Sequence, residues 1–240
     1  MDPKLRCFQH CRKDTNIVCF RLPVHCPLCH AETAETPCRI PPYVLPSPFV
    51  TSSAAPRSVV VRPTRGSFIS HYDHACDLHI GLTNASGHVT EFDERGLNVG
   101  SIWPQCLAVL TWPLPQATQV DVHASPGPIT RRTDDLSLDA SRAWDTALEG
   151  LVSGVSGHLW TSSRYNEQTW NCFDLVFHIL PLLGNDLDLD LSQLGPGERR
   201  VQFCDRYIVP KCRRVEEFVH LYRQVSNHGF VCVPRQQSSS

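Results

Sequence analysis

The chain has 240 residues, of which 41% are hydrophobic and 19% are charged, and its formal net charge is -2. This composition is typical of a folded globular protein and excludes a largely disordered chain. A charge so close to zero gives no field that would attract nucleic acid, so no nucleic-acid partner is expected. No apolar run approaches the ~20 residues of a membrane-spanning helix, and no membrane span is expected.

Cysteine is unusually frequent, with twelve residues in the chain. The first residues lack the apolar run of a secretory signal, so we expect an intracellular protein, either cytoplasmic or nuclear. In these compartments clustered cysteines bind metal or react more often than they form disulfides. Half of the cysteines fall near the N-terminus: Cys7, Cys11, Cys19, Cys26, Cys29 and Cys38.

The spacing of four of these cysteines, C-x3-C-x14-C-x2-C, indicates a metal site. Two short pairs joined by a hairpin supply the four ligands of tetrahedral Zn²⁺, and residues 17–20 between them are strand-like. Residues 1–36 are therefore predicted to form a zinc-ribbon-like module, with His10 or Cys19 as substitute ligands. The alternative is a group of reduced cysteines without metal. The predicted ligands of a structural zinc ion are Cys7, Cys11, Cys26 and Cys29.

Seven prolines between residues 37 and 63 predict a linker or strap over residues 37–57. The main domain is expected over 58–235, followed by a disordered tail at 236–240. Its predicted strands, recognised by β-branched or alternating apolar residues, are 58–61, 77–83, 88–92 and 106–112. A turn at 84–87 makes the second and third strands a hairpin that brings His79 near Glu91.

Helices are expected in the second half of the main domain. Apolar residues at helical spacing predict one helix from residue 139 to Gly154 and a last helix over 215–227. Residues 114–135 are predicted to be irregular, and residues 201–208 are strand-like. Residues 186–191 alternate in polarity but are acidic, which favours a loop or an edge strand.

A third predicted helix begins at Cys172, directly after Asn171, which can cap it. The helix dipole and the unpaired N–H groups of a first turn favour a thiolate, so Cys172 is a candidate nucleophile. A buried core thiol is the competing interpretation. A Cys-His pair needs a base and an orienting group, and His79 and Glu91 are the candidates for these two roles.

Several motifs resemble the makorin opposite-strand protein family. They are the run Asp77-Leu78-His79-Ile80-Gly81-Leu82-Thr83-Asn84, the pairs Trp144-Asp145, Arg164-Tyr165 and Asn171-Cys172, and the segments Leu221-Tyr222-Arg223 and His228-Gly229-Phe230. The cysteine-rich N-terminus fits the same family. The resemblance covers most of the chain, but it implies no biochemical activity.

A more distant likeness concerns the order of His79 before Asn171-Cys172. This order is similar to that of circularly permuted papain-like hydrolases, which include lecithin:retinol acyltransferase-like proteins and thiol peptidases. The resemblance implies an α+β domain, an antiparallel sheet with packed helices, in which His79 is the base and Cys172 the nucleophile. The chain departs from the acyltransferase branch at Glu91, where that branch usually has a second histidine, and at Phe173-Asp174, where Glu-His is frequent.

Two functions follow as expectations. In the first, the papain-like domain is catalytically silent and the protein is a binding adaptor for an unknown protein partner. In the second, it is an active thiol hydrolase or acyltransferase that cleaves an amide, isopeptide or ester bond. Backbone N–H groups at the start of the Cys172 helix would then hold the oxyanion.

Overall fold

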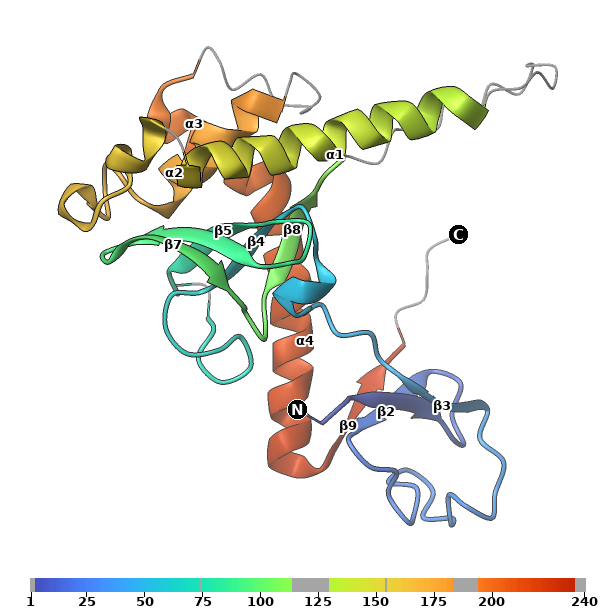
Figure 1. The fold of residues 1–240 in the computed structure, drawn as a ribbon. Coiled ribbons are helices and arrows are strands. Elements are labelled where there is room, and N and C mark those ends of the chain that lie inside the picture. Colours follow the sequence, from blue (N-terminus) through green and yellow to red (C-terminus); the bar gives the residue numbers. More distant parts are fainter. Residues whose placement is uncertain (1–2, 74, 114–129, 154, 184–193, 236–240) are drawn as a thin grey trace. The chain divides into compact units, whose positions relative to one another are not determined.

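The structure is a computed structural model that describes residues 3–73, 75–113, 130–153, 155–183 and 194–235 (Figure 1). The expectations for residues 114–129, 186–191 and 236–240 lie outside these ranges. The chain divides into two compact units. The first unit comprises Met1–Pro48, Phe68–Ser70 and Cys212–Ser240, and the second comprises Phe49–Ser67 and His71–Lys211.

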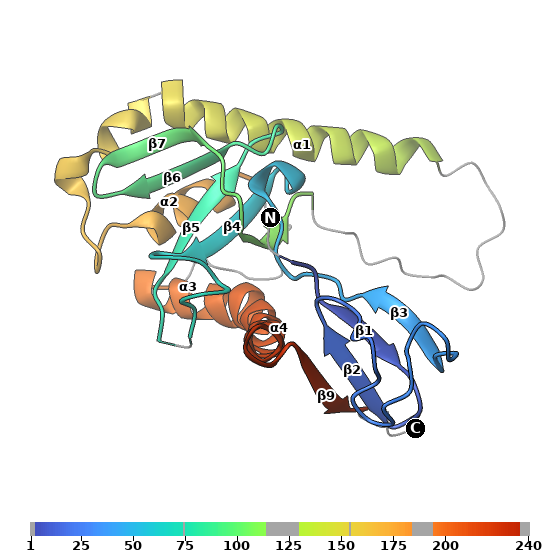
Figure 2. The same ribbon diagram turned by 90° about the horizontal axis from the view of Figure 1, so that it is seen from below.

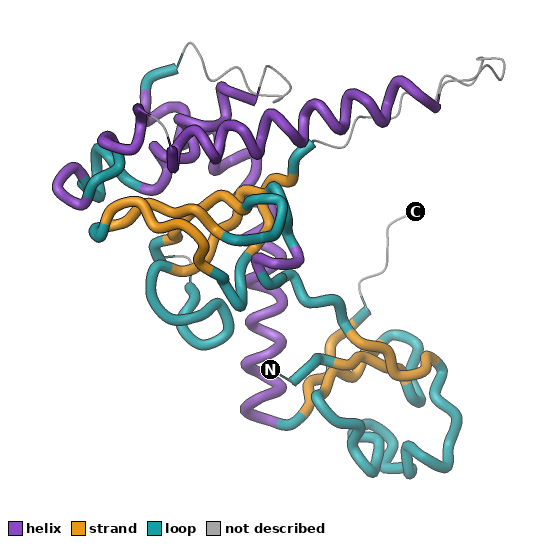
Figure 3. The backbone as a smooth tube through the Cα atoms, viewed as in Figure 1, coloured by secondary structure: helices purple, strands orange, loops and turns teal. Residues whose placement is uncertain are grey.

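The first unit contains a four-stranded antiparallel sheet with the order β3-β1-β2-β9. Strand β1 (Arg6–Gln9) pairs with β2 (Thr15–Cys19), while β3 (Ile40–Val44) and β9 (Phe230–Pro234) form the edges. The segment between β2 and β3 is loop, as Figure 3 shows. Strand β9 therefore completes, from the far end of the sequence, the sheet that the cysteine-rich segment begins.

The two faces of this sheet bury different partners. Cys7 of β1 and Val18 of β2 pack with Tyr222 and Val225 of helix α4 (Val209–His228). The next residue pair in the register, Phe8 and Ile17, points to the opposite face. That face buries Phe8, Ile17 and Cys19 together with Cys26 of the following loop. Because successive side chains of a strand point to opposite faces, only cysteines on the same face of this sheet can lie close together.

The second unit is built on a five-stranded antiparallel sheet with the order β7-β6-β5-β4-β8 (Figure 2). Its strands are β4 (Ser58–Pro63), β5 (Leu78–Thr83), β6 (Val89–Asp93), β7 (Gly96–Ser101) and β8 (Leu107–Thr111). The four strands predicted here are confirmed, and so is the β5–β6 hairpin. Strand β7 was not predicted, because Gly96 and Gly100 weaken the alternating pattern of apolar and polar residues in this segment.

The helices of the second unit are α1 (Thr130–Ser153), α2 (Cys172–Ile179) and α3 (Pro196–Phe203). Helix α1 begins nine residues before the predicted start, so the prediction of irregular structure up to residue 135 is wrong. The nearest helix-breaking residues before it lie at 126–128, and no Gly or Pro interrupts the sequence from there to residue 149. With two antiparallel sheets and packed helices, the architecture is α+β, as expected.

The strand predicted at residues 201–208 is wrong, because this segment is helical. It comprises the end of α3 and a π-helical turn at Cys204–Ile208. Helix α3 starts with Pro196 at its first position and with Glu198, whose carboxylate accepts a hydrogen bond from the Gly195 N–H at 3.1 Å. Proline at the first helical position is pre-organised for a helix, and this start signal outweighs the apparent alternation further on.

Side-chain hydrogen bonds fix α1 to the sheet of the second unit. The indole N–H of Trp144 donates to the carbonyl of Thr83 at 2.8 Å. The guanidinium of Arg57 pairs with the Asp145 carboxylate at 2.7 Å. Helix α2 packs against β5 and β6, and its residues Leu175, Val176 and Ile179 are fully buried. The packing of α2 on these strands sets the position of its first residue, Cys172.

Candidate functional site

The hairpin β5–β6 joins an imidazole to a carboxylate. Nε2 of His79 lies 2.8 Å from Oε2 of Glu91, and both side chains are buried. Gly81, which shares a strand face with His79, is the cross-strand partner of Glu91. The diagonal arrangement across an antiparallel pair therefore brings the two functional groups together, as the sequence predicted.

The Glu91 carboxylate has further polar partners besides His79. The indole N–H of Trp103 lies 3.4 Å from Oε1, and Nη2 of Arg62 lies 3.4 Å from Oε2. The Arg62 guanidinium also stacks over the Trp103 ring at 4.5 Å. Burial by itself would raise the pKa of Glu91, but hydrogen bonds from His79 and Ser101 and the charge of Arg62 lower it. Glu91 is therefore a carboxylate at neutral pH.

The start of α2 is fixed by a reciprocal capping arrangement. Oδ1 of Asn171 accepts a hydrogen bond from the Phe173 N–H at 3.0 Å, and the Asp174 carboxylate accepts one from the Asn171 N–H at 2.8 Å. The Asn171 amide also donates to the Glu167 carbonyl at 2.6 Å. Arg200 lies 3.6 Å from the Asp174 carboxylate. These bonds hold Cys172 at the first position of the helix, as predicted.

Cys172 and His79 face each other across the site. Both side chains line one cleft, and the His79 ring has Glu91 as its hydrogen-bond partner. Burial opposes the protonated form of the ring, yet the hydrogen bonds and charges of Cys172 and Glu91 raise the pKa of His79 to about 9. Burial, with Cys172 nearby, also raises the pKa of Tyr165. His79 therefore holds a proton more firmly than an ordinary histidine does.

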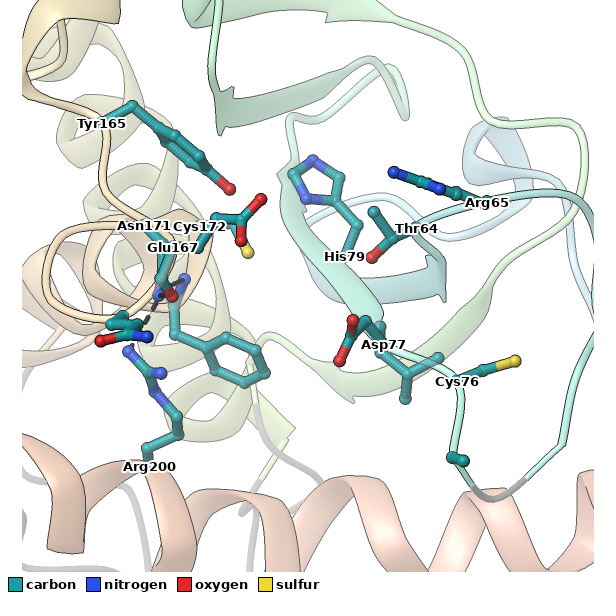
Figure 4. Close-up of a pocket in the computed structure, with 14 residues that line it drawn as sticks. Thr64, Arg65, Cys76, Asp77, His79, Tyr165, Glu167, Asn171, Cys172 and Arg200 are labelled. Carbon is teal, nitrogen blue, oxygen red and sulfur yellow. Dashed lines mark hydrogen bonds between the residues drawn. The ribbon is translucent and has the colours of Figure 1, made fainter.

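These groups open into a cleft of about 720 Å³ in the second unit (Figure 4). One side of the cleft is formed by the residues that follow β4, the loop before β5 and the start of β5, and it includes Asp77 and His79. The other side is formed by the loop before α2 and by α2 itself, with Glu167 and Cys172. Although Cys172 is buried, its side chain lines the cleft and can be reached by a small molecule.

A second constellation lies in the first unit. Ligand atoms of His10, Cys11, Cys26 and Cys29 all lie within 4.8 Å of one another. The sulfurs of Cys11 and Cys26 are 4.0 Å apart, and the sulfur of Cys29 is 3.3 Å from Nδ1 of His10. Tetrahedral bonds of about 2.3 Å to sulfur place neighbouring ligand atoms about 3.8 Å apart. Three thiols and one imidazole at this spacing fit a Zn²⁺ site.

The structure brings Cys11, Cys26 and Cys29 together but places Cys7 elsewhere. Cys7 lies on the α4 side of the sheet, in the apolar cluster with Val18 and Tyr222. His10, which the sequence offered only as a substitute ligand, occupies the fourth place. Cys19 packs beside Cys26 in the apolar cluster, and burial raises the pKa of its thiol.

Backbone and side-chain contacts support the metal-type cluster. The Leu28 N–H lies 3.4 Å from the Cys26 sulfur, and the His30 N–H donates to the Cys26 carbonyl at 2.8 Å. His30 has a φ of 60°, the left-handed conformation that closes the tight turn after Cys29. Nε2 of His10 lies 2.6 Å from the Thr36 hydroxyl, which orients Nδ1 towards the thiols.

Sequence reasoning missed the residues that surround Glu91. Arg62 could have been noticed as a charged residue at the end of an otherwise apolar strand, directly opposite His79 in the register. Trp103 carried no such signal, because a single tryptophan outside a regular element is most often a core residue.

The second unit is thus an antiparallel α+β unit with a cleft lined by Cys172 and His79. The chain belongs to the family described as DUF4796 C-terminal, whose model matches residues 42–126 and 129–225. It is 29% identical over 236 residues to the MKRN2 opposite strand protein of Homo sapiens, covering 96% of this chain and 91% of that protein. No solved structure matches the chain. Within the described ranges, no helix is long and apolar enough to cross a membrane.

Proposed function

We propose that the second unit is a permuted papain-like thiol hydrolase with Cys172 as nucleophile, His79 as base and Glu91 as the orienting carboxylate. One observation carries the proposal: His79 lines the same cleft as Cys172, and its Nε2 lies 2.8 Å from the buried Glu91 carboxylate. A merely structural histidine would have no need of a thiol on one side, a buried carboxylate on the other and an adjoining cleft.

The residues support a two-step reaction at a carbonyl carbon. His79 takes the Cys172 proton, and Nδ1 is the ring nitrogen that remains for this transfer because Nε2 is held by Glu91. The thiolate then attacks the carbonyl carbon, the bond to the leaving nitrogen or oxygen breaks, and His79 returns the proton to the leaving group. Water hydrolyses the resulting thioester, which releases the acid and restores the thiol.

The start of α2 supplies the oxyanion site in this mechanism. Asn171 engages the N–H groups of Phe173, Asp174 and Leu175 through its side chain or carbonyl. Among the described residues, no acceptor takes the N–H of Cys172 itself. This first-turn donor, with the positive end of the helix dipole, stabilises the negative oxygen of the intermediate.

The test is competitive labelling of the native protein with iodoacetamide at low concentration, read by peptide mass spectrometry. We expect Cys172 to be alkylated ahead of the other eleven cysteines, and His79→Ala to abolish this preference. His88→Ala is a matched control, because His88 is exposed on the same hairpin. Uniform alkylation of exposed thiols, with Cys172 no faster than Cys232, would contradict the proposal and leave the silent binding adaptor, with its unknown protein partner, as the better reading.

We also propose that the first unit binds one structural Zn²⁺ through His10, Cys11, Cys26 and Cys29. The ion would join the β1–β2 turn to the knuckle at Cys26–Cys29, and it would supply folding energy to a loop-rich segment. Four protein ligands leave no open coordination position, so we assign this site no catalysis.

Native mass spectrometry of freshly purified protein tests the metal site. We expect one zinc per chain in the wild type and loss of zinc in Cys26→Ser. Cys232→Ser should retain the metal, because Cys232 is exposed on β9 of the same unit and outside the cluster. Wild-type protein without metal, or equal loss of metal in both variants, would refute the proposal.

A further inference from the structure

The side chains that line the cleft indicate which kind of substrate can bind beside Cys172. Charged side chains of both signs come from both walls: Arg65, Asp77, Glu167 and Arg200. Neutral hydrogen-bonding side chains add to them: Thr64, Tyr165, Gln168 and Asn171. Apart from the cysteines, the apolar contribution is limited to three side chains: Ala75, Leu78 and Phe173.

The charges on both walls disfavour a long acyl chain. Burying a hydrocarbon chain is favourable by about 0.8 kcal/mol per CH₂ group, provided that the chain contacts apolar surface. Here Asp77 and Glu167 are exposed carboxylates on opposite sides of the cleft, as Figure 4 shows. A hydrocarbon chain lying between them would remove water from both charges without replacing its hydrogen bonds.

The same walls suit a polypeptide backbone. Every residue of an extended peptide presents one N–H donor and one C=O acceptor. The carboxylates of Asp77 and Glu167 accept from N–H groups, and the Gln168 amide can satisfy either kind of group. The charges of the cleft do not share one sign, since Arg65 and Arg200 line it together with these two carboxylates. The cleft therefore does not select a polyanion.

We propose that the cleft receives an extended polypeptide segment, and that the bond presented to Cys172 is an amide rather than the ester of a long acyl chain. This inference rests on the proposed function, because it concerns the same thiol. In the reaction, the Cys172 sulfur bonds to the carbonyl carbon, the C–N bond breaks, and the amine leaves with the proton from His79. Water then releases the new carboxylate.

Two irreversible probes with one reactive group test the inference. A chloromethyl ketone attached to a tetrapeptide of polar residues is compared with a chloromethyl ketone attached to a twelve-carbon acyl chain. The rate of adduct formation at Cys172 is followed by intact mass spectrometry on the full chain, with Cys172→Ala as the blank. We expect the peptide probe to react about tenfold faster or more. Equal rates, or a faster acyl probe, would overturn the inference.

A cleft variant distinguishes recognition from simple access. In Glu167→Leu combined with Gln168→Leu, the loss of polar groups should reduce the preference for the peptide probe. Glu94→Leu is the matched control, because Glu94 is exposed in the β6–β7 turn and does not line the cleft. An unchanged preference in the double variant would count against the inference. Iodoacetamide selectivity for Cys172 is measured separately, so failure of the thiol site and failure of peptide recognition give different results.

Discussion

Gly81 faces Glu91 directly across the β5–β6 hairpin, two residues after His79 on the same strand. A methyl group added at Gly81 would lie 2.7 Å from a Val89 methyl carbon and 3.2 Å from the Trp103 ring. The missing side chain therefore gives Trp103 the room to reach the Glu91 carboxylate. The absence of a side chain at Gly81 on β5 thus allows the hydrogen bond between Trp103 and Glu91 of β6.

Gly81→Ala tests this relationship. Because a Cβ would overlap Val89 and press on Trp103, we expect a loss of about 1–3 kcal/mol in the free energy of unfolding and slower alkylation of Cys172. Gly150→Ala is the control, since a Cβ there meets nothing within 4 Å in the last turn of α1. Alanine in a helix interior should stabilise the protein by roughly 0.5–1 kcal/mol. Urea denaturation measures both, and equal effects would argue against a crowded hairpin.

Glu91→Gln removes the negative charge beside His79 but keeps a hydrogen-bonding group of the same size. Glu91 helps to raise the pKa of His79, so the variant should lower that pKa and make His79 a weaker base for the Cys172 thiol. We therefore expect slower alkylation of Cys172 in the variant near pH 7. The measurement is the iodoacetamide rate as a function of pH. If the variant showed the same dependence of alkylation rate on pH as the wild type, Glu91 would have no role in the reactivity of Cys172.

Stability should depend on pH through His79. Its folded pKa of about 9 lies above the ordinary 6.5, so its protonated form stabilises the fold. This contribution is complete below pH 6.5 and is lost as the pH rises through 9. In His79→Gln the decline of unfolding free energy between pH 6.5 and 9 should be smaller than in the wild type. Urea denaturation of both proteins at the same pH values tests this prediction. If the unfolding free energies of wild type and variant declined in parallel with pH, the raised pKa of His79 would be contradicted.

Asn171→Ala removes the cap of α2. The Phe173 N–H loses its acceptor and the Glu167 carbonyl loses a donor, so we expect a cost of about 1–2 kcal/mol and slower alkylation of Cys172. Asn171→Ser keeps a capping oxygen and should lose less. Comparing the two variants by urea denaturation separates capping from general packing. If serine were as harmful as alanine, the cap would not be the cause.

The elements that carry the thiol site were predictable because their signals are local. The β-branched run of β4, the alternation of β5, the turn before β6 and the cap at Asn171 each lie within a few residues. Glu91 came within reach because the hairpin fixes its register against His79. The contacts of Arg62 and Trp103 with Glu91 could not be predicted. They join β4, β6 and the segment after β7 through side-chain packing, which no local sequence pattern shows.

The metal-type cluster shows the opposite limit. Cysteine spacing correctly indicated Cys11, Cys26 and Cys29 as neighbours, but spacing does not say which sheet face a residue occupies. Cys7 and Phe8 are adjacent, and the strand sends them to opposite faces. The pairing of β9 with β2 was also beyond sequence reasoning, because the two strands lie more than two hundred residues apart.

The pairing of β2 with β9 has a consequence for synthesis of the protein. The ribosome releases the cysteine-rich segment first, but the four-stranded sheet cannot close until Phe230–Pro234 has emerged. Helix α4, which covers one face of that sheet, also arrives late. The N-terminal thiols are therefore synthesised before strand β9, and a metal ion bound during translation would be held while the four-stranded sheet is still incomplete.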